Sequence, residues 1–220
     1  MFAVVESGNI TSFPKGNKGI VVGDVKHPAT IFTLWTEAER NAIGVYTVEM
    51  NATNLKDKEF YTNTGITYTY DSDNDKVTGS YGTATARAIA DVNEVWTQAE
   101  IDKGEAPDGT SAGDAKNDVD GNQIVTKGLK TQYKTIFNAQ ASDLLSTTDW
   151  YGVKASEVSG YSVPSAITTY RAAVRTKVNA METAIDNCAN VDVLKTLLTY
   201  TLQENGTTTR PLGEFPDEVV

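Results

Sequence analysis

Three aspartates at alternate positions are the feature of this sequence that most resembles a site for chemistry. Asp71, Asp73 and Asp75 have the spacing with which a calcium-binding loop begins, because carboxylates so placed converge on one hard cation. Such a loop requires glycine at its sixth position and glutamate at its twelfth, whereas this chain has Lys76 and Gly82 there. We therefore interpret the segment as the solvated tip of a β-hairpin and expect no bound metal.

Other residue types that perform catalysis are isolated in the sequence. The only histidine, His27, precedes a proline in a turn-like segment, and we interpret it as a surface or satisfied residue. The only cysteine, Cys188, excludes an intramolecular disulfide and is expected to be a small buried group on a helix. The motifs G-x-S-x-G, H-E-x-x-H and C-x-x-C do not occur. A glycosidase would need a pair of catalytic carboxylates, but with 29 acidic residues the sequence does not single out any such pair. We expect no catalytic residues and no cofactor.

The charge distribution bears on possible partners. A formal net charge of −10 argues against a nucleic-acid partner, since a phosphate backbone would be repelled. Arg171 and Arg175 are four residues apart and share one helix face, which leaves two interpretations open. The face docks onto the acidic segment 98–122 or onto a partner protein, or it is a solvated face with local ion pairs. The candidate interaction residues are Trp150, Tyr151, Tyr170, Arg171 and Arg175.

The first hundred residues indicate short strands separated by turns. A T-x-x-E capping box, Thr36 with Glu39, predicts the start of a brief helix, and Gly44 suits its left-handed end. The glycine-rich segment 15–24 lacks the order of a phosphate-binding loop and is expected to be a connector. Alternating apolar residues and turn signals predict strands over residues 2–6, 10–13, 45–50, 66–70 and 76–83.

The C-terminal half has helical periodicity. A helix is expected over about 123–145, with an apolar stripe formed by Leu129, Tyr133, Ile136, Phe137, Ala141, Leu144 and Leu145. A second helix should begin near Pro164, with Ser162 or Val163 as its cap. Its inner face has heptad-like spacing and comprises Ile167, Tyr170, Val174, Val178, Met181, Ile185 and Cys188. A third helix, entered through Asn190 or Asp192, is expected to include Val193, Leu194, Leu197, Leu198, Thr201 and Leu202.

Together these elements predict an α+β protein. We expect a β-rich N-terminal domain with a short inserted helix over residues 1–97, and a polar linker or long loop over 98–122, which has almost no large apolar side chains. A three-helix domain over 123–204 and an extended tail over 205–220 should follow. The N-terminal residues lack the pattern of a secretory signal, and no apolar run approaches the ~18 residues that span a bilayer, so we expect no membrane contact.

The connection between the first two long helices is the most distinctive stretch. We expect Trp150 and Tyr151 to end the first helix and to cover the mouth of a helical hairpin, while Val153, Val158 and Val163 pack from the connection. No nucleophile stands beside a base there. We interpret this stretch as a structural device that holds two antiparallel helices together.

This stretch also resembles the C-terminal segment of tail-fibre and tail-fibre-assembly proteins of tailed bacteriophages. Such proteins carry a leucine pair, then T-D-W, a variable stretch, a proline and an aromatic-Arg helix. The matching residues here are Leu144, Leu145, Thr148, Asp149, Trp150, Pro164, Tyr170, Arg171 and Arg175. I-T-x-F-P at 10–14 and G-V-Y-x-V at 44–48 resemble the same group. The segments K-G-N-K-G-I and S-Y-G-T-A-T-A-R-A resemble virion structural proteins of marine cyanophage-like viruses, and residues 98–122 have no counterpart.

The resemblance implies a structural virion protein of the tail or its fibres that acts through protein–protein contacts and carries no catalytic residues. It implies other tail proteins as partners, homo-oligomers within the particle, and assembly in the host bacterial cytoplasm. A tail-fibre assembly chaperone fits the motifs equally well. A capsid decoration protein and a glycan-cleaving depolymerase are further alternatives with less support.

Overall fold

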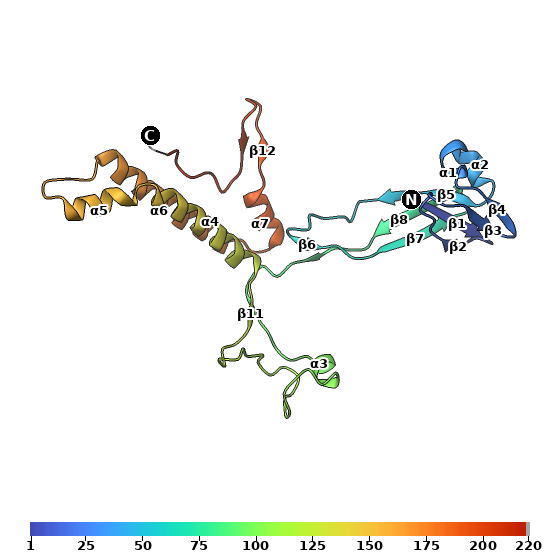
Figure 1. Cartoon of the computed structure of the whole chain (residues 1–220), viewed down its shortest axis with the longest axis horizontal. Coiled ribbons are helices and arrows are strands. Elements are labelled where there is room, and N and C mark those ends of the chain that lie inside the picture. Colours follow the sequence, from blue (N-terminus) through green and yellow to red (C-terminus); the bar gives the residue numbers. More distant parts are fainter. Residues whose placement is uncertain (219–220) are drawn as a thin grey trace. The chain divides into compact units, whose positions relative to one another are not determined.

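The computed structural model describes residues 1–218 and confirms the expected α+β class (Figure 1). The chain forms two compact units that divide between Ala86 and Arg87. The first unit is rich in β-strands and the second contains the long helices. The expected domain limits at 97, 122 and 204 stay a prediction.

The first unit is built on a five-stranded sheet with the order β2-β1-β5-β8-β7. The strands are β1 (Phe2–Glu6), β2 (Asn9–Ser12), β5 (Val45–Asn51), β7 (Ile66–Asp71) and β8 (Lys76–Tyr81). All neighbouring strands are antiparallel except β5 and β8, which are parallel. The outer strands β2 and β7 approach each other, so the sheet is nearly closed. The rings of Phe13 and Tyr68 bridge this gap with centroids 4.5 Å apart.

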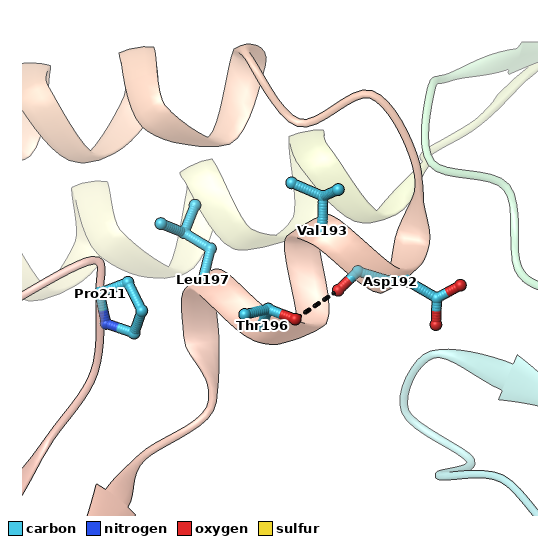
Figure 2. A pocket seen from close by; sticks show the side chains of 5 residues that line it. All are labelled: Asp192, Val193, Thr196, Leu197 and Pro211. Atoms are coloured by element: carbon cyan, nitrogen blue, oxygen red, sulfur yellow. Dashed lines mark hydrogen bonds between the residues drawn. The ribbon is translucent and has the colours of Figure 1, made fainter.

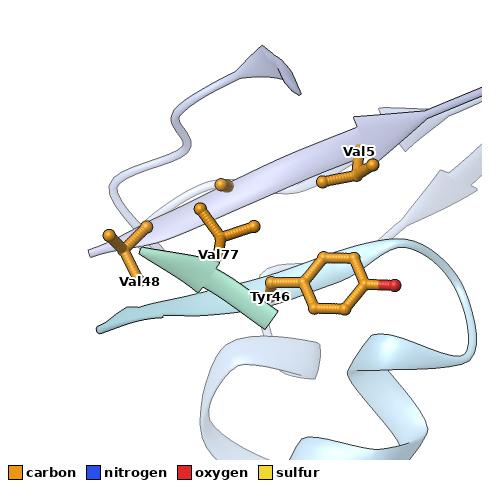
Figure 3. Packing of buried hydrophobic residues seen from close by; sticks show 5 residues of the cluster. Val5, Tyr46, Val48 and Val77 are labelled. Atoms are coloured by element: carbon orange, nitrogen blue, oxygen red, sulfur yellow. The ribbon is translucent and has the colours of Figure 1, made fainter. Parts of the chain in front are cut away.

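The alternation of side chains along the strands creates two cores in the first unit. One face of the sheet buries Ala3, Val5, Tyr46, Val48 and Val77 (Figure 3). The opposite face buries Val4 and Val45 against Ile31 and Phe32 of the short helix α1 (Ile31–Leu34). Burial on both faces explains why the short apolar runs of β1 and β5 adopt strands.

Local sequence signals set the short helix of this unit as expected. Helix α2 (Glu37–Asn41) begins with the complete Thr36–Glu39 capping box, and Gly44 ends this region with a φ of 77°. The turn between β1 and β2 uses Ser7 and Gly8, both with positive φ. The glycine-rich connector contains a small hairpin, β3 (Ile20–Val22) with β4 (Val25–His27), and a second pair joins β6 (Tyr61–Thr62) to β9 (Thr85–Ala86).

The second unit opens with a polar excursion closed at its neck by β10 (Val92–Asn93) and β11 (Val125–Thr126). Inside it, α3 (Gln98–Asp102) begins with its own capping box, and Lys116 pairs with Glu100 at 2.5 Å. The stretch 98–122 is therefore a long loop with local order, held by polar contacts rather than by an apolar core. The expectation that the first long helix begins at 123 is wrong, because residues 125–126 pair with β10.

The long helices are α4 (Leu129–Ser146), α5 (Asp149–Glu157), α6 (Ser165–Asp186) and α7 (Val191–Leu198). The whole heptad-like face of α6 is buried, as expected, and packs against α4 within the chain. Cys188 is buried and donates to the carbonyl of Ala184. Ile136 is an error in the expected α4 stripe, since it is 47% exposed and lies outside the buried positions 129, 133, 137 and 141.

The third helix and the tail differ partly from expectation. Asn190 caps α7 by accepting from the amide of Val193 at 3.0 Å, which confirms the predicted entry. Thr201 and Leu202 are not helical. They form β12 (Thr201–Leu202), which pairs with β13 (Thr208–Thr209), since the β-branched threonines favour a hairpin.

Among residues 1–218, no helix is long and apolar enough to cross a bilayer.

Candidate interaction surface

The connection after α4 forms an exposed corner, which we call the α5 corner and define as Asp149–Tyr161. Trp150 is 51% exposed and Val153 is 54% exposed, and Val158 is exposed as well. The expectation that Trp150 and Tyr151 end the first long helix is wrong: they belong to the separate helix α5. Trp150 does not cover the mouth of the hairpin but presents much of its surface to solvent.

Two threonines explain why α4 stops before Trp150. The hydroxyls of Thr147 and Thr148 donate to the carbonyls of Leu144 and Leu145, at 2.9 and 3.0 Å. Side-chain hydroxyls that bind preceding carbonyls compete with the helical ladder. Thr148 then adopts a non-helical conformation with ψ of 4°, and α5 begins at the next residue.

Arg171 fixes the α5 corner to α6. Its guanidinium donates to the carbonyl of Leu145 and to the hydroxyl of Thr148, both at 2.7 Å, and pairs with Asp149 at 2.8 Å. The side chain of Arg171 is only 20% exposed. Its rigid fork of donors therefore joins the end of α4, the start of α5 and the first half of α6.

The aromatic groups of the corner stack with one lysine. The rings of Trp150 and Tyr151 have centroids 3.9 Å apart. The amine of Lys154 lies 5.5 Å from the Trp150 ring and 4.4 Å from the Tyr161 ring. These contacts hold the exposed indole in place, and a preorganised aromatic group loses little entropy when it binds a partner.

The other two candidate residues occupy different environments on α6. Tyr170 is 4% exposed, and its hydroxyl has no hydrogen-bond partner among residues 1–218. Burial raises the pKa of Tyr170, with a smaller contribution from the Glu218 carboxylate. Arg175 is exposed and makes no ion pair within the described chain. The structure thus brings Trp150, Tyr151 and Arg171 together through Asp149, and places Tyr170 in the core.

The remaining chemistry-bearing residues have local structural roles. The carboxylate of Asp71 accepts from the amides of Asp73 and Asn74, which is the arrangement of a hairpin tip. Asp75 accepts from the hydroxyls of Tyr46 and Tyr70 at 2.6 and 3.0 Å and ties the tip to β5. His27 packs edge-on against Trp35 with ring centroids 5.9 Å apart. Within residues 1–218 no three potential ligands gather at one point as a metal site requires.

Shallow cavities occur on the helical unit. One cavity of about 390 Å³ lies on α7 and is lined by Asp192, Val193, Thr196, Leu197 and Pro211 (Figure 2). Two others, of about 480 and 600 Å³, lie between α6 and the C-terminal segment. Their lining is predominantly apolar, which suits protein contacts better than polar substrates.

Sequence reasoning missed two parts of this surface. Lys154 follows Trp150 by four residues, a spacing that brings two side chains together only on a helix. Because no helix was expected in this segment, the sequence did not predict the contact of Lys154 with the Trp150 ring. The cavities beside α6 depend on Pro216, more than 35 residues away in sequence from most of the helix wall, and no local signal indicates that contact.

No family model, no curated protein and no solved structure matches this chain.

Proposed function

We propose that this chain is a structural component of the tail or tail fibres of a tailed bacteriophage and acts through protein–protein contacts. The single observation that carries the proposal is the α5 corner, where the T-D-W segment of the resemblance forms a rigid, exposed aromatic surface. Trp150 and Val153 are both about half exposed, and Arg171 holds the corner to two helices. Trp, Tyr and Arg are the residues in which binding energy is concentrated at interfaces.

The energetics of the corner support a contact surface over a purely structural one. A tryptophan that only filled the mouth of a helical hairpin would be buried, because its stabilising effect depends on the apolar area removed from water. Here Trp150 leaves much of that area exposed, whereas Leu129 and Leu194 on neighbouring helices are fully buried. The area that remains exposed at Trp150 becomes useful only when another protein covers it.

A tail-fibre assembly chaperone is the second candidate, since the same exposed corner would serve to hold a client. In both roles the chain binds other proteins and catalyses no reaction, and the partners would be virion tail proteins in the infected bacterium. The two roles differ in whether the chain stays in the finished particle.

Quantitative mass spectrometry of purified particles tests the proposal. A structural role predicts a fixed copy number per particle in a small multiple of three or six. A copy number near zero, with the protein abundant in infected lysate, would reject the structural role in favour of the chaperone. Substitution of Trp150 by alanine should lower incorporation, while Leu34→Ala, at an even more exposed apolar residue of the first unit, should not.

A further inference from the structure

The turn between β12 and β13 contains a reactive sequence that the proposed function does not use. Asn205 is followed by Gly206 and Thr207, and no other asparagine of the sequence precedes a glycine. Residues 199–209 are all exposed, so water has access to this turn. Because glycine lacks a Cβ, the side chain of the preceding residue can approach the glycine nitrogen closely.

Two donors hold the side-chain carbonyl of Asn205. Its Oδ1 accepts from the amide of Thr207 at 3.0 Å and from the hydroxyl of the same residue at 2.7 Å. Donors at these distances stabilise negative charge that develops on a carbonyl oxygen during nucleophilic attack. The carbon Cγ of Asn205 is therefore a polarised electrophile.

The nucleophile nearest to this carbon along the chain is the backbone nitrogen of Gly206. A bond between the two closes a five-membered ring, and intramolecular attack of this kind benefits from a high effective concentration. The Gly206 amide donates to the carbonyl of Gln203 at 3.0 Å, and this bond must open before the nitrogen attacks. The hairpin has only two paired positions, and an isolated two-stranded hairpin is marginally stable, so this bond opens readily.

We propose that Asn205 is a self-modification site, at which the side-chain amide becomes a carboxylate without an enzyme. Thr207 supplies both donors that hold the charge on Oδ1, and water is the only co-reactant. This inference goes beyond the proposed function and does not depend on it.

The reaction has two steps. Hydroxide takes the proton from the Gly206 nitrogen, the nitrogen attacks Cγ of Asn205, and the carbonyl electron pair moves onto Oδ1. The pair then returns, the bond from Cγ to Nδ2 breaks, and Nδ2 takes a proton from water and leaves as ammonia. Water opens the resulting cyclic imide: attack at Cγ gives aspartate, and attack at the backbone carbonyl carbon gives isoaspartate. Both products have gained water and lost ammonia.

The products alter the hairpin. Both place a new negative charge next to Glu204, and isoaspartate also adds one methylene to the main chain within the turn. The register of a hairpin is fixed by the length of its turn, so the pairing of β12 with β13 should open in the isoaspartate form. The exposed hairpin would then change its charge and its pairing as the protein ages.

Incubation of the purified full chain at physiological temperature and pH tests the inference. Aliquots are digested, and mass spectrometry with electron-transfer fragmentation distinguishes asparagine, aspartate and isoaspartate. Asn51 is a matched control in the same digest: it is exposed and its Oδ1 accepts from the amide of Thr53 at 3.0 Å, but Ala52 follows it. Asn205 should be converted while Asn51 keeps its amide. An Asn205 that stays intact, or equal conversion at both positions, overturns the inference.

Variants of residue 207 test the role of its hydroxyl. Thr207→Ala removes one of the two donors and should slow the conversion about three- to tenfold, the usual effect of one lost hydrogen bond. Thr207→Ser retains the hydroxyl and should retain the rate. An unchanged or faster conversion in Thr207→Ala would overturn the role given to Thr207.

The control position provides a second test. Ala52→Gly creates an Asn-Gly-Thr sequence at Asn51, whose Oδ1 receives no bond from the hydroxyl of Thr53 within residues 1–218. Asn51 should then react, but more slowly than Asn205. Equal rates at the two positions would overturn the acceleration by the Thr207 hydroxyl. None of these measurements uses virus particles, so a failure here leaves the proposed function standing and the reverse also holds.

Discussion

Replacing Arg171 by methionine isolates the contacts that hold the α5 corner. Methionine retains most of the apolar stem of arginine but none of its donors. The change removes two hydrogen bonds from a charged donor to neutral oxygens, on Leu145 and Thr148, at 2.7 Å each. Each such bond contributes about 1.5 kcal/mol when partly buried. The ion pair to Asp149 adds at most about 0.5 kcal/mol, because that carboxylate is 61% exposed.

The expected loss is therefore about 3 kcal/mol, confined to the junction of α4, α5 and α6. Arg175→Met is the matched control, since Arg175 lies one turn further along the same helix without an ion pair in the described chain. It should change the stability by less than about 0.5 kcal/mol. The chain has two units and need not unfold in one step, so native-state hydrogen exchange of α5 amides is the appropriate assay. Equal effects of the two variants would refute the role given to Arg171.

Three further predictions concern other parts of the chain. The pKa of Glu100 is lowered to about 2, chiefly by its hydrogen bond from Lys116. The stabilising effect of the Glu100 carboxylate is therefore complete above about pH 4.5 and is lost as the pH falls towards 2. An NMR titration of the carboxyl group measures this pKa, and a midpoint near 4.5 would contradict the prediction. In denaturant unfolding, Tyr170→Ala should lower the free energy of unfolding by about 3 kcal/mol and Trp150→Ala by less than about 1 kcal/mol, because only Tyr170 is buried. Equal losses of stability for the two variants would contradict this prediction. Gly128→Ala should weaken the β10–β11 pairing at the neck of the polar excursion, since the added Cβ would lie 2.2 Å from the backbone oxygen of Ala90. Gly152→Ala should not destabilise α5, because its Cβ would meet no other atom. Hydrogen exchange of the β10 and β11 amides should be faster in the first variant only.

The elements that the sequence predicts well are those governed by local rules. The heptad-like spacing identifies seven side chains that are all buried. Six of them lie on one face of α6, because on an α-helix this spacing aligns them, and Cys188 follows the end of the helix. The Thr36–Glu39 capping box and the left-handed Gly44 are confirmed for the same reason, since both depend on residues within one turn. The β7–β8 hairpin also follows from its own alternation and its polar tip.

The errors occur where distant residues decide the structure. Residues 125–126 leave the expected helix because a strand more than 30 residues earlier offers them hydrogen bonds. Thr201 and Leu202 leave α7 to pair with residues 208–209. The exposure of Trp150 follows from the break at Thr148, where side-chain hydroxyls end α4 before the tryptophan can pack. The sequence nominates the five candidate interaction residues. It does not predict that Tyr170 is buried in the helical core, apart from the exposed α5 corner.

A photo-cross-linking measurement tests the central claim most directly, which is that the α5 corner contacts other proteins in an assembled tail. A photoreactive amino acid would replace Trp150 in virus particles, with the same group at the exposed Ala139 of α4 as the control. The proposal predicts a cross-link from position 150 to a tail protein or to a second copy of this chain, and none from position 139. Particles that contain the chain but give no cross-link from position 150 would contradict it.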